Sequence, residues 1–391
     1  MRLETMLDRP VTPDVRDLTV VVHETIPEIW PSAGDPAEVA ARHVFQTREF
    51  IEAWMATRGA RATVSAYLVE IRNGFGEPIL LLPLTITKRG GGRILGFMDG
   101  GLADYSAPVI VAKGLHWTED AARALWELVV AKLPPVDLVQ IENMPAMIGN
   151  EQNPLALIST APNPESTHGS DLTLPWEALE ATQDQVKRLK QKWRALERVG
   201  AVTLKVAEDE ADVERILAKV LAQKQRRFDE TKVNGFDRDP DKLAYFRRAT
   251  TLFHAVGALE LCALQVGEEI VASAWNLKQG GVVYGILMGF EAGEWTKFSS
   301  GRILNLMLLR RLKEAGLRYL DHGIGDEGWK LTSCDTHVPL RQMLEVRSLR
   351  GRAMLAARGV KQQVRELRAW KALQPVKWAL LRKLGRGNPA A

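Results

Sequence analysis

The sequence contains little cysteine and no long apolar run. Cys262 and Cys334 are the only cysteines in 391 residues, which is too few for a disulfide framework, and no group of Cys and His has the spacing of a zinc site. No stretch approaches the ~18 apolar residues of a membrane-spanning helix, and the N-terminal residues lack the apolar core of a signal peptide. We therefore expect a cytoplasmic protein without a metal, in which any membrane contact is peripheral.

Negative charge is scarce near the C-terminus. From Arg350 onward Glu366 is the only acidic residue among many lysines and arginines, although the whole chain carries a net charge of only +4. We predict that residues 349–391 form a basic helical appendage that the chemistry does not need. Such a segment either is a solvated amphipathic helix or docks on RNA or on an anionic membrane surface.

What the sequence does contain is the same order of predicted elements twice. The second copy has a hairpin and a third strand within 258–290, a helix over 300–316 and a closing strand over 317–324. The first copy has its hairpin around "NGFGEP", and we place its third strand at 107–114, before a helix that starts near Thr118 and the closing strand "VDLVQIEN". The same order of strands and helices, with little sequence identity between the two copies, predicts duplicated domains of mixed α/β class.

The chain is long enough for two domains. We place the first at residues 1–165 and the second at 166–348, with the C-terminal appendage after them. The stretch "APNPESTHGS" between the domains is polar and rich in proline and serine, which is typical of a linker. Just after it, residues 176–198 are expected to form one basic helix.

A candidate anion site precedes the helix of the second copy. Ser299 and Ser300 can cap that helix, Gly301 lets a ligand approach the backbone, and Arg302 adds a cation. Unpaired N–H groups at the positive end of a helix dipole bind anions. The alternative is a plain serine N-cap beside a solvated arginine.

Ionisable side chains also gather where the closing strand ends, in "YLDHGIGDEGWK". We expect the glycines to turn the chain so that Asp326, Glu327 and Lys330 face one space, with Asp321 at its rim. A carboxylate there could take a proton from a nucleophile, and an exposed lysine with little packing to lose could hold phosphate or an oxyanion. Alternatively, Asp321 caps the loop and Glu327 pairs with Lys330 at the surface. His322 should point the other way and be a satisfied core histidine.

These stretches resemble the Gcn5-related N-acetyltransferase (GNAT) fold, and more closely its CelD/BcsL-like branch, which is associated with cellulose and exopolysaccharide synthesis. The segments that carry the resemblance are "LLPLTITKRGGGRILGFMDGGLADYSAPVI", "KQKWRALERVGAVTLKV", "FDRDPDKLAYFRRAT" and "EEIVASAWNLKQGGVVYGILMGFEAGEWTKFSSGRILNLMLLRRLKEAGLRYLDHGIGDEGWK". Together they extend from about Phe45 to Lys330. The tandem arrangement is also similar to that of Fem-type peptidyltransferases.

The resemblance implies two tandem GNAT-like acyl-CoA N-acyltransferase domains, of which the first is degenerate and lies on the acceptor side. It places the pyrophosphate of acetyl-CoA, or of another acyl-CoA, at the loop that contains Ser299, Ser300, Gly301 and Arg302. Lys330 occupies the place of a lysine that lies at the active cleft in the wider group. The preceding Trp329 has the size of the usual aromatic residue there, without a tyrosine hydroxyl.

Asp104 and Tyr105 match a recurrent "DY" of the CelD-like group. They could line the acceptor pocket from across the domain interface, or could simply be an Asx turn and an anchoring ring. Tyr284 is a weaker candidate for protonating the leaving thiolate, and backbone N–H groups of strand 281–290 could hold the oxyanion.

We therefore expect an acyltransferase that moves an acetyl or other acyl group to an amine or hydroxyl of a small molecule or glycan precursor, by direct attack on the thioester. The proposed catalytic groups are Lys330, Glu327, Asp321 and Tyr284, with Asp326 on the substrate side. One alternative is Fem-like transfer from aminoacyl-tRNA, which would give the basic helix 176–198 a phosphate-binding role. Another is a non-catalytic scaffold of a polysaccharide synthase.

Overall fold

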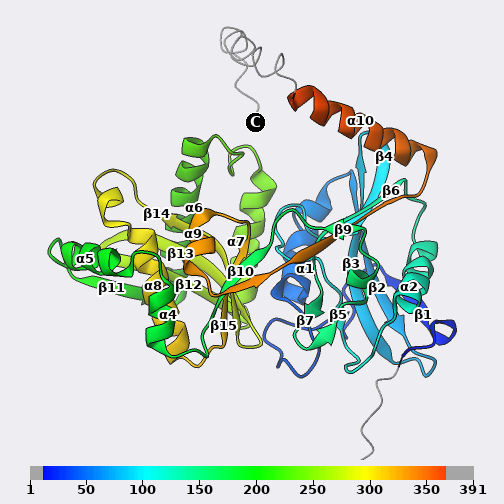
Figure 1. Ribbon diagram of the computed structural model, residues 1–391, viewed down its shortest axis with the longest axis horizontal. Helices are drawn as coiled ribbons and strands as arrows, with labels where there is room; N and C mark the ends of the chain where they lie inside the picture. Colours follow the sequence, from blue (N-terminus) through cyan, green and yellow to red (C-terminus); the bar gives the residue numbers. More distant parts are fainter. Residues whose placement is uncertain (1–11, 367–391) are drawn as a thin grey trace, which may run out of the picture.

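Two large β-sheets stand side by side in the computed structural model, which describes residues 12–366 (Figure 1). The first has the order β1-β2-β3-β4-β6-β17-β9, with β5 paired to β3. Its strands are β1 Thr19–His23, β2 Val64–Arg72, β3 Pro78–Arg89, β4 Gly92–Phe97, β5 Val109–Ile110, β6 Leu138–Pro145, β9 Ala161–Pro162 and β17 Leu340–Val346.

The second sheet has the order β11-β12-β13-β14-β15-β10-β16. Its strands are β10 Thr167–Asp171, β11 Val202–Val206, β12 Leu259–Val266, β13 Glu269–Gln279, β14 Val282–Phe290, β15 Tyr319–Ile324 and β16 Thr336–Val338. In both sheets a run of antiparallel strands ends on a parallel partner that follows a helix, β4 with β6 and β14 with β15. The predicted duplication and the mixed α/β class are thereby confirmed.

The helices cover both sheets, and a small hairpin joins β6 to the middle of the chain. The helices are α1 Arg48–Met55, α2 Glu119–Lys132, α3 Pro154–Leu157, α4 Trp176–Thr182, α5 Val186–Glu197, α6 Glu210–Thr231, α7 Pro240–Ala255, α8 Ser300–Glu314, α9 Gly328–Ser333 and α10 Leu349–Glu366. The short elements are the 3₁₀ turns Val15–Asp17, Val44–Gln46, Arg58–Ala60 and Gly293–Phe298 and the hairpin β7 Met147–Ile148 with β8 Glu151–Gln152. None of the helices within residues 12–366 is long and apolar enough to cross a membrane.

Local sequence explains where the main crossover helices form. Thr118 precedes α2, and its hydroxyl accepts from Ala121 N at 3.2 Å, as expected of a threonine N-cap. In α8 the apolar residues recur at helical spacing, so that Ile303, Leu304 and Leu308 are buried against the second sheet. Full burial of such a side chain stabilises the fold by about 1.5–3 kcal/mol.

The chain passes between the sheets along two neighbouring paths (Figure 1). Outward, β9 lies in the first sheet and β10 in the second; on the return, β16 pairs with β10 and β17 pairs with β9 and β6. The predicted linker is therefore largely strand, and Thr167, His168 and Ser170 within it are buried. Its polar composition did not reveal this, because the partners lie more than a hundred residues away in the sequence.

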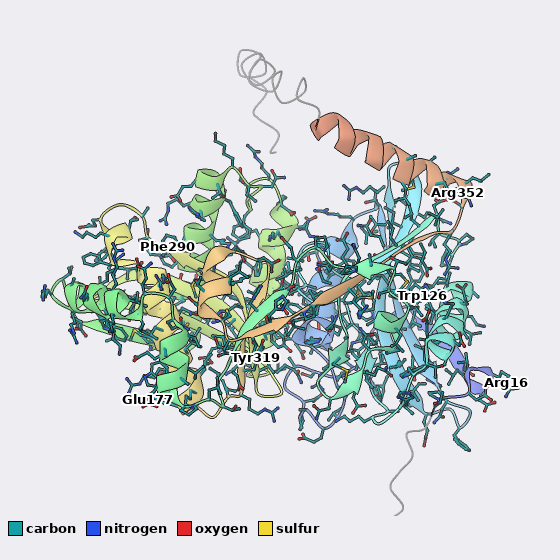
Figure 2. The ribbon with its side chains drawn as sticks, viewed as in Figure 1. Arg16, Trp126, Glu177, Phe290, Tyr319 and Arg352 are labelled. Atoms are coloured by element: carbon teal, nitrogen blue, oxygen red, sulfur yellow. The ribbon has the colours of Figure 1, made fainter. Side chains whose placement is uncertain are left out.

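The predicted second domain, residues 166–348, includes the strand Leu340–Val346. In the structure this strand completes the first sheet and not the second. The start of the predicted appendage also packs there, since α10 contacts β4 and β17. Ser348 Oγ donates to Asp137 Oδ1 at 2.5 Å, and a side chain at Gly351 would collide with the Asp137 carbonyl. Figure 2 shows Arg352 on the same half of the molecule as Trp126, whereas Phe290 and Tyr319 lie in the other half. Residues 367–391 lie outside the described range.

Two predicted elements differ from those observed. The third strand of the first copy is Gly92–Phe97 rather than 107–114, because the "GGG" stretch is a tight turn that brings Gly92 opposite Arg89. The basic helix predicted over 176–198 is broken into α4 and α5 at Gln183–Gln185, where Gln185 has a φ of 50°. That left-handed residue redirects the chain between the two helices.

One core is shared by both domains. It combines aromatic residues of the first domain with aromatic residues that lie in or against the second sheet. Its large buried members include Trp30, Phe45, Phe50, Trp54, Tyr245, Phe246, Phe253, Trp275 and Tyr284. Separate cores lie between the first sheet and α2 and between the second sheet and α8. The two domains therefore cannot separate without exposing part of their own interiors.

Truncation tests the role of β17. A chain that ends after Val338 lacks β17, so β6 loses its antiparallel partner and the buried Leu340 and Met343; we expect it not to unfold cooperatively. A chain that ends after Ser348 keeps these contacts and should melt within a few degrees of the full chain. Calorimetry of both chains checks this, and a cooperative transition in the shorter one would contradict a structural role for β17.

Candidate active site

A cavity of about 580 Å³ opens where β14 and β15 separate. The two parallel strands pair only between Val282–Tyr284 and Tyr319–Asp321. Beyond this point β14 continues its ladder with β13 alone, and residues 285–288 line the cavity. Their backbone polar groups on the β15 side have no strand partner and are available to a ligand.

The start of α8 forms one wall of this cavity. The four residues of the predicted anion site, Ser299, Ser300, Gly301 and Arg302, all line it. Ser299 is the N-cap residue, but its side chain makes no capping hydrogen bond and instead accepts from Lys192 Nζ at 2.6 Å. The expectation that both serines cap the helix is therefore wrong: Ser300 Oγ donates to Val271 O at 3.3 Å.

Gly301 and Arg302 complete this wall. A Cβ at Gly301 would lie 3.1 Å from the ring of Phe290, so any side chain there occupies the space beside the helix start. Arg302 donates to the Asp184 carbonyl and has its other terminal nitrogen 3.7 Å from Asp184 Oδ2. The first N–H groups of a helix have no partner within the helix. This wall can therefore bind an anion.

Lys330 is buried, contrary to the sequence-based expectation of an exposed lysine with little packing. It is 5% exposed, and Nζ donates to the carbonyls of Gly323 at 3.2 Å and Ile324 at 2.7 Å. Glu327, which is exposed, pairs with it at 3.0 Å. The short helix α9, whose N-cap residue is Glu327, brings Lys330 back to the carbonyls at the end of β15.

Asp321 lies behind the cavity rather than at its rim. It is 3% exposed; the Tyr105 hydroxyl donates to its Oδ2 at 2.5 Å and Gly323 N donates to its Oδ1 at 2.7 Å. Burial raises the pKa of Asp321 to about 6, although the bond from Tyr105 and the charge of Lys330 oppose that rise. Tyr105 thus links the first domain to the closing strand of the second.

Asp104 brings a carboxylate from the first domain into the cavity. Gly323 has a φ of +76°, and a Cβ there would lie 2.7 Å from Asp104 Oδ2, so only glycine suits this position. Burial raises the pKa of Asp104 to about 7; the nearby Asp321 raises it further and Lys330 lowers it. A carboxyl group with that pKa exchanges its proton near neutral pH.

Two predicted site residues lie away from this cavity. Asp326 accepts from His168 Nε2 at 2.8 Å and so does not converge with Glu327 and Lys330. Tyr284 is buried in the shared core, where its hydroxyl lies 3.2 Å from His43 Nδ1. Burial raises its pKa well above the usual value. Neither side chain lines the cavity.

Several residues that line the cavity were missed. Asn305 interrupts the apolar run of α8, is 7% exposed, and its Oδ1 is buried without a hydrogen-bond partner among the described residues. His322 lines the cavity instead of filling the core, and burial lowers its pKa to about 3. Lys224 of α6 also lines it. The sequence signal was weak in each case: one polar residue within an apolar run, or one lysine among many.

The fold agrees with the comparisons with known proteins. Residues 183–331 match the family of acetyltransferase (GNAT) domains. This part of the chain therefore has a GNAT-type acyltransferase fold, as predicted, and the two copies form the tandem GNAT-like fold expected from the sequence. No curated protein matches the chain.

Among solved structures, the chain is similar to FemX, with 11% identity over 77% of this chain and 91% of that one and a TM-score of 0.51. That likeness is one of fold alone. The chain is also similar to the C-terminal domain of a putative lysylphosphatidylglycerol synthetase from Agrobacterium fabrum, with 16% identity over 73% of this chain and 85% of that one and a TM-score of 0.45. A tandem GNAT protein from the clavulanic acid biosynthesis pathway matches with 12% identity, coverage of 85% and 99% and a TM-score of 0.42.

Replacing Lys330 by alanine should destabilise the protein. The change leaves the carbonyls of Gly323 and Ile324 without their donor, which costs on the order of 2 kcal/mol. Glu327→Gln is the control, because it keeps these two bonds and weakens only an ion pair with an exposed partner, worth under about 1 kcal/mol. Thermal unfolding should show a clear decrease for Lys330→Ala and almost none for Glu327→Gln. Equal midpoints for the two variants would contradict the structural role.

Proposed function

We propose that the protein transfers an acyl group from an acyl-CoA to an amine or hydroxyl acceptor in the cavity between β14 and β15. The observation that carries this proposal is the composition of that one cavity. It combines the anion-binding start of α8, the unpaired edge of β14 and a carboxylate from the other domain, Asp104. A donor site, a site for an oxyanion and a proton acceptor therefore lie within one space.

The residues present fit the donor. Backbone N–H groups at Ser300 and Gly301, together with Arg302, would hold the pyrophosphate, and Lys192 next to Ser299 adds a second cation. The unpaired Oδ1 of Asn305 is a hydrogen-bond acceptor that suits an amide N–H of the pantetheine arm. When bound, the thioester supplies an acyl carbon that is already activated for direct attack.

Asp104 is the best-placed general base. It would accept the proton from the attacking nitrogen or oxygen while the bond to the acyl carbon forms and the carbon–sulfur bond breaks; the departing thiolate takes its proton from solvent. The pKa of about 7 that burial gives Asp104 suits this task near neutral pH. N–H groups on the unpaired edge of β14 would donate to the oxygen that becomes negative.

The other predicted groups support this arrangement. Lys330 would hold the turn at Gly323 and Ile324 and lower the pKa of Asp104 through its charge. Asp321 would fix Tyr105 and thereby the neighbouring Asp104. Glu327, which is exposed and already paired, is a weaker base than Asp104 in this arrangement. An acceptor from cellulose or exopolysaccharide synthesis stays a prediction that rests on the family resemblance.

Blocking the start of α8 tests the donor site. Gly301→Glu adds bulk and negative charge where the pyrophosphate would lie, so coenzyme A should no longer raise the melting temperature. Gly301→Ala, which adds only a Cβ beside Phe290, should retain most of the effect. In the parent, coenzyme A at about 100 times its dissociation constant should add about 2.7 kcal/mol to the free energy of unfolding.

Either of two results would count against the donor site. If coenzyme A stabilises Gly301→Glu as strongly as the parent, the phosphate site lies elsewhere. If coenzyme A does not stabilise the parent and RNA binds with a steep salt dependence, Fem-like transfer through the basic helix α5 is favoured instead.

The pH dependence of transfer tests Asp104. The value of kcat/KM should rise about tenfold per pH unit below about pH 7 and level off above it, because only ionised Asp104 accepts a proton. Asp104→Asn should lower the rate by about 10²- to 10⁴-fold and remove this limb. Glu327→Gln is the matched control and should keep the limb. An unchanged limb in Asp104→Asn would exclude the assignment.

Stability gives a second readout for the same carboxyls. The folded pKa values of Asp104 and Asp321, about 7 and about 6, exceed their ordinary value of 3.8. The folded protein therefore binds more protons than the unfolded chain between these limits, and the free energy of unfolding should fall as the pH rises from about 4 to about 7. Asp104→Asn should show a smaller fall in denaturant titrations at several pH values.

A further inference from the structure

Two lysines from neighbouring helices flank one aromatic ring next to the cavity. Lys224 Nζ of α6 lies 5.4 Å from the ring centroid of Phe228, and Lys242 Nζ of α7 lies 5.6 Å from the same centroid. Lys224 also lines the cavity. The α6 helix packs on β14 and α7 packs on α1 of the first domain. The two lysines therefore lie where the second domain meets the acceptor side.

Two of the carboxylates near this pair already have other cationic partners. Asp239 accepts two bonds from Arg58, at 2.6 Å and 2.5 Å, and Glu327 pairs with Lys330. Within residues 12–366 neither of the two lysines lies within ion-pair distance of a carboxylate, and each has a cation–π contact with Phe228. Lys224 in the cavity lining and Lys242 beside it therefore place two ammonium groups here without a direct carboxylate partner among the described residues.

The surroundings of each lysine oppose its charge. Burial lowers the pKa of Lys224, and the charge of Lys242 lowers it further. Burial likewise lowers the pKa of Lys242, as does the charge of Arg58. Two cations that repel each other in a partly desolvated place gain from any anion that binds between them. A lysine ammonium binds carboxylate and phosphate as a compact point charge.

The pair also lies close to the proposed chemistry. The charges of Glu327 and Lys330 act on Lys224, and the charge of Asp104 acts on Lys242. An anion held there would therefore be near the carboxylate proposed as the base. The donor's pyrophosphate has its own proposed site at the start of α8, so this second positive site is left for the acceptor.

We infer that the acceptor is an anion, whose phosphate or carboxylate group binds to Lys224 and Lys242 beside Phe228 and presents its amine or hydroxyl to Asp104. This inference rests on the proposed function and specifies the substrate class of the same cavity. It applies to acceptors with either group, since both have the charge and the oxygen acceptors that two ammonium groups require.

Calorimetric titration with simple anions tests the inference. Inorganic phosphate and, separately, acetate are titrated into three proteins at constant ionic strength: the parent, Lys224→Gln/Lys242→Gln, and the control Lys88→Gln/Lys132→Gln. The control removes the same charge from two exposed lysines of the first domain. Anion binding at the start of α8 remains in all three proteins, so any difference between them reports the lysine pair.

For phosphate, for acetate or for both, the parent and the control should have equal affinities. Lys224→Gln/Lys242→Gln should bind the same anion at least about tenfold more weakly than the parent, since a hydrogen bond to a charged group contributes about 1.5–3 kcal/mol. A larger loss for phosphate indicates a phosphorylated acceptor, and a larger loss for acetate indicates a carboxylate. The inference is overturned if all three proteins bind both anions alike, or if no anion binds to the parent.

A coenzyme A titration of the same three proteins separates this inference from the proposed function. All three should bind coenzyme A with the same affinity, because the substitutions lie away from the start of α8. If coenzyme A binds none of them, the proposed donor fails, whereas a phosphate difference between the variants would still show the anion site. If coenzyme A binding is lost only with the lysine pair, the pair belongs to the donor site and the inference fails.

Discussion

The hydrogen bond from Tyr105 to Asp321 determines how the two domains meet. It joins the first domain to the closing strand of the second inside their shared core, at 2.5 Å and with both side chains buried. The same carboxylate accepts from Gly323 N, which turns the chain so that Asp104 fits beside it. Removing the tyrosine hydroxyl would leave a buried carboxylate short of a donor, which is costly. The cavity's geometry on the acceptor side depends on this bond.

The return of the chain as β17 to the first sheet also holds the two domains together. Because the chain returns to complete the first sheet after finishing the second, the first sheet is not whole without β17, which follows the last strand of the second sheet. A duplicated pair of domains has thereby become one folding unit with a continuous aromatic core. A cavity that draws residues from both halves needs such rigidity, since small displacements between the domains would separate Asp104 from the start of α8.

Charge within the cavity follows from burial rather than from composition. Burial raises the pKa of Asp104 to about 7 and lowers that of His322 to about 3, so both can be neutral near pH 7. Near Lys242, the carboxylates of Asp239 and Asp241 already pair with Arg58 and Arg61. The cavity therefore brings together a carboxyl group that titrates near neutral pH, the start of a helix and the ammonium group of Lys224.

The sequence by itself determined those features that depend on neighbouring residues. The repeated order of strands and helices, the loop at Ser299–Arg302 and the glycine-rich turn before Lys330 could all be predicted, because periodicity and turn residues act locally. Only the tertiary structure decided that Leu340–Val346 joins the first sheet, since alternating apolar residues indicate a strand but not its partner. It also decided that Lys330 is buried, that Asp326 pairs with His168 and that Asp104 reaches the cavity. The surroundings of an ionisable side chain are set by contacts with residues far away in the sequence, and for these the local pattern carries no signal.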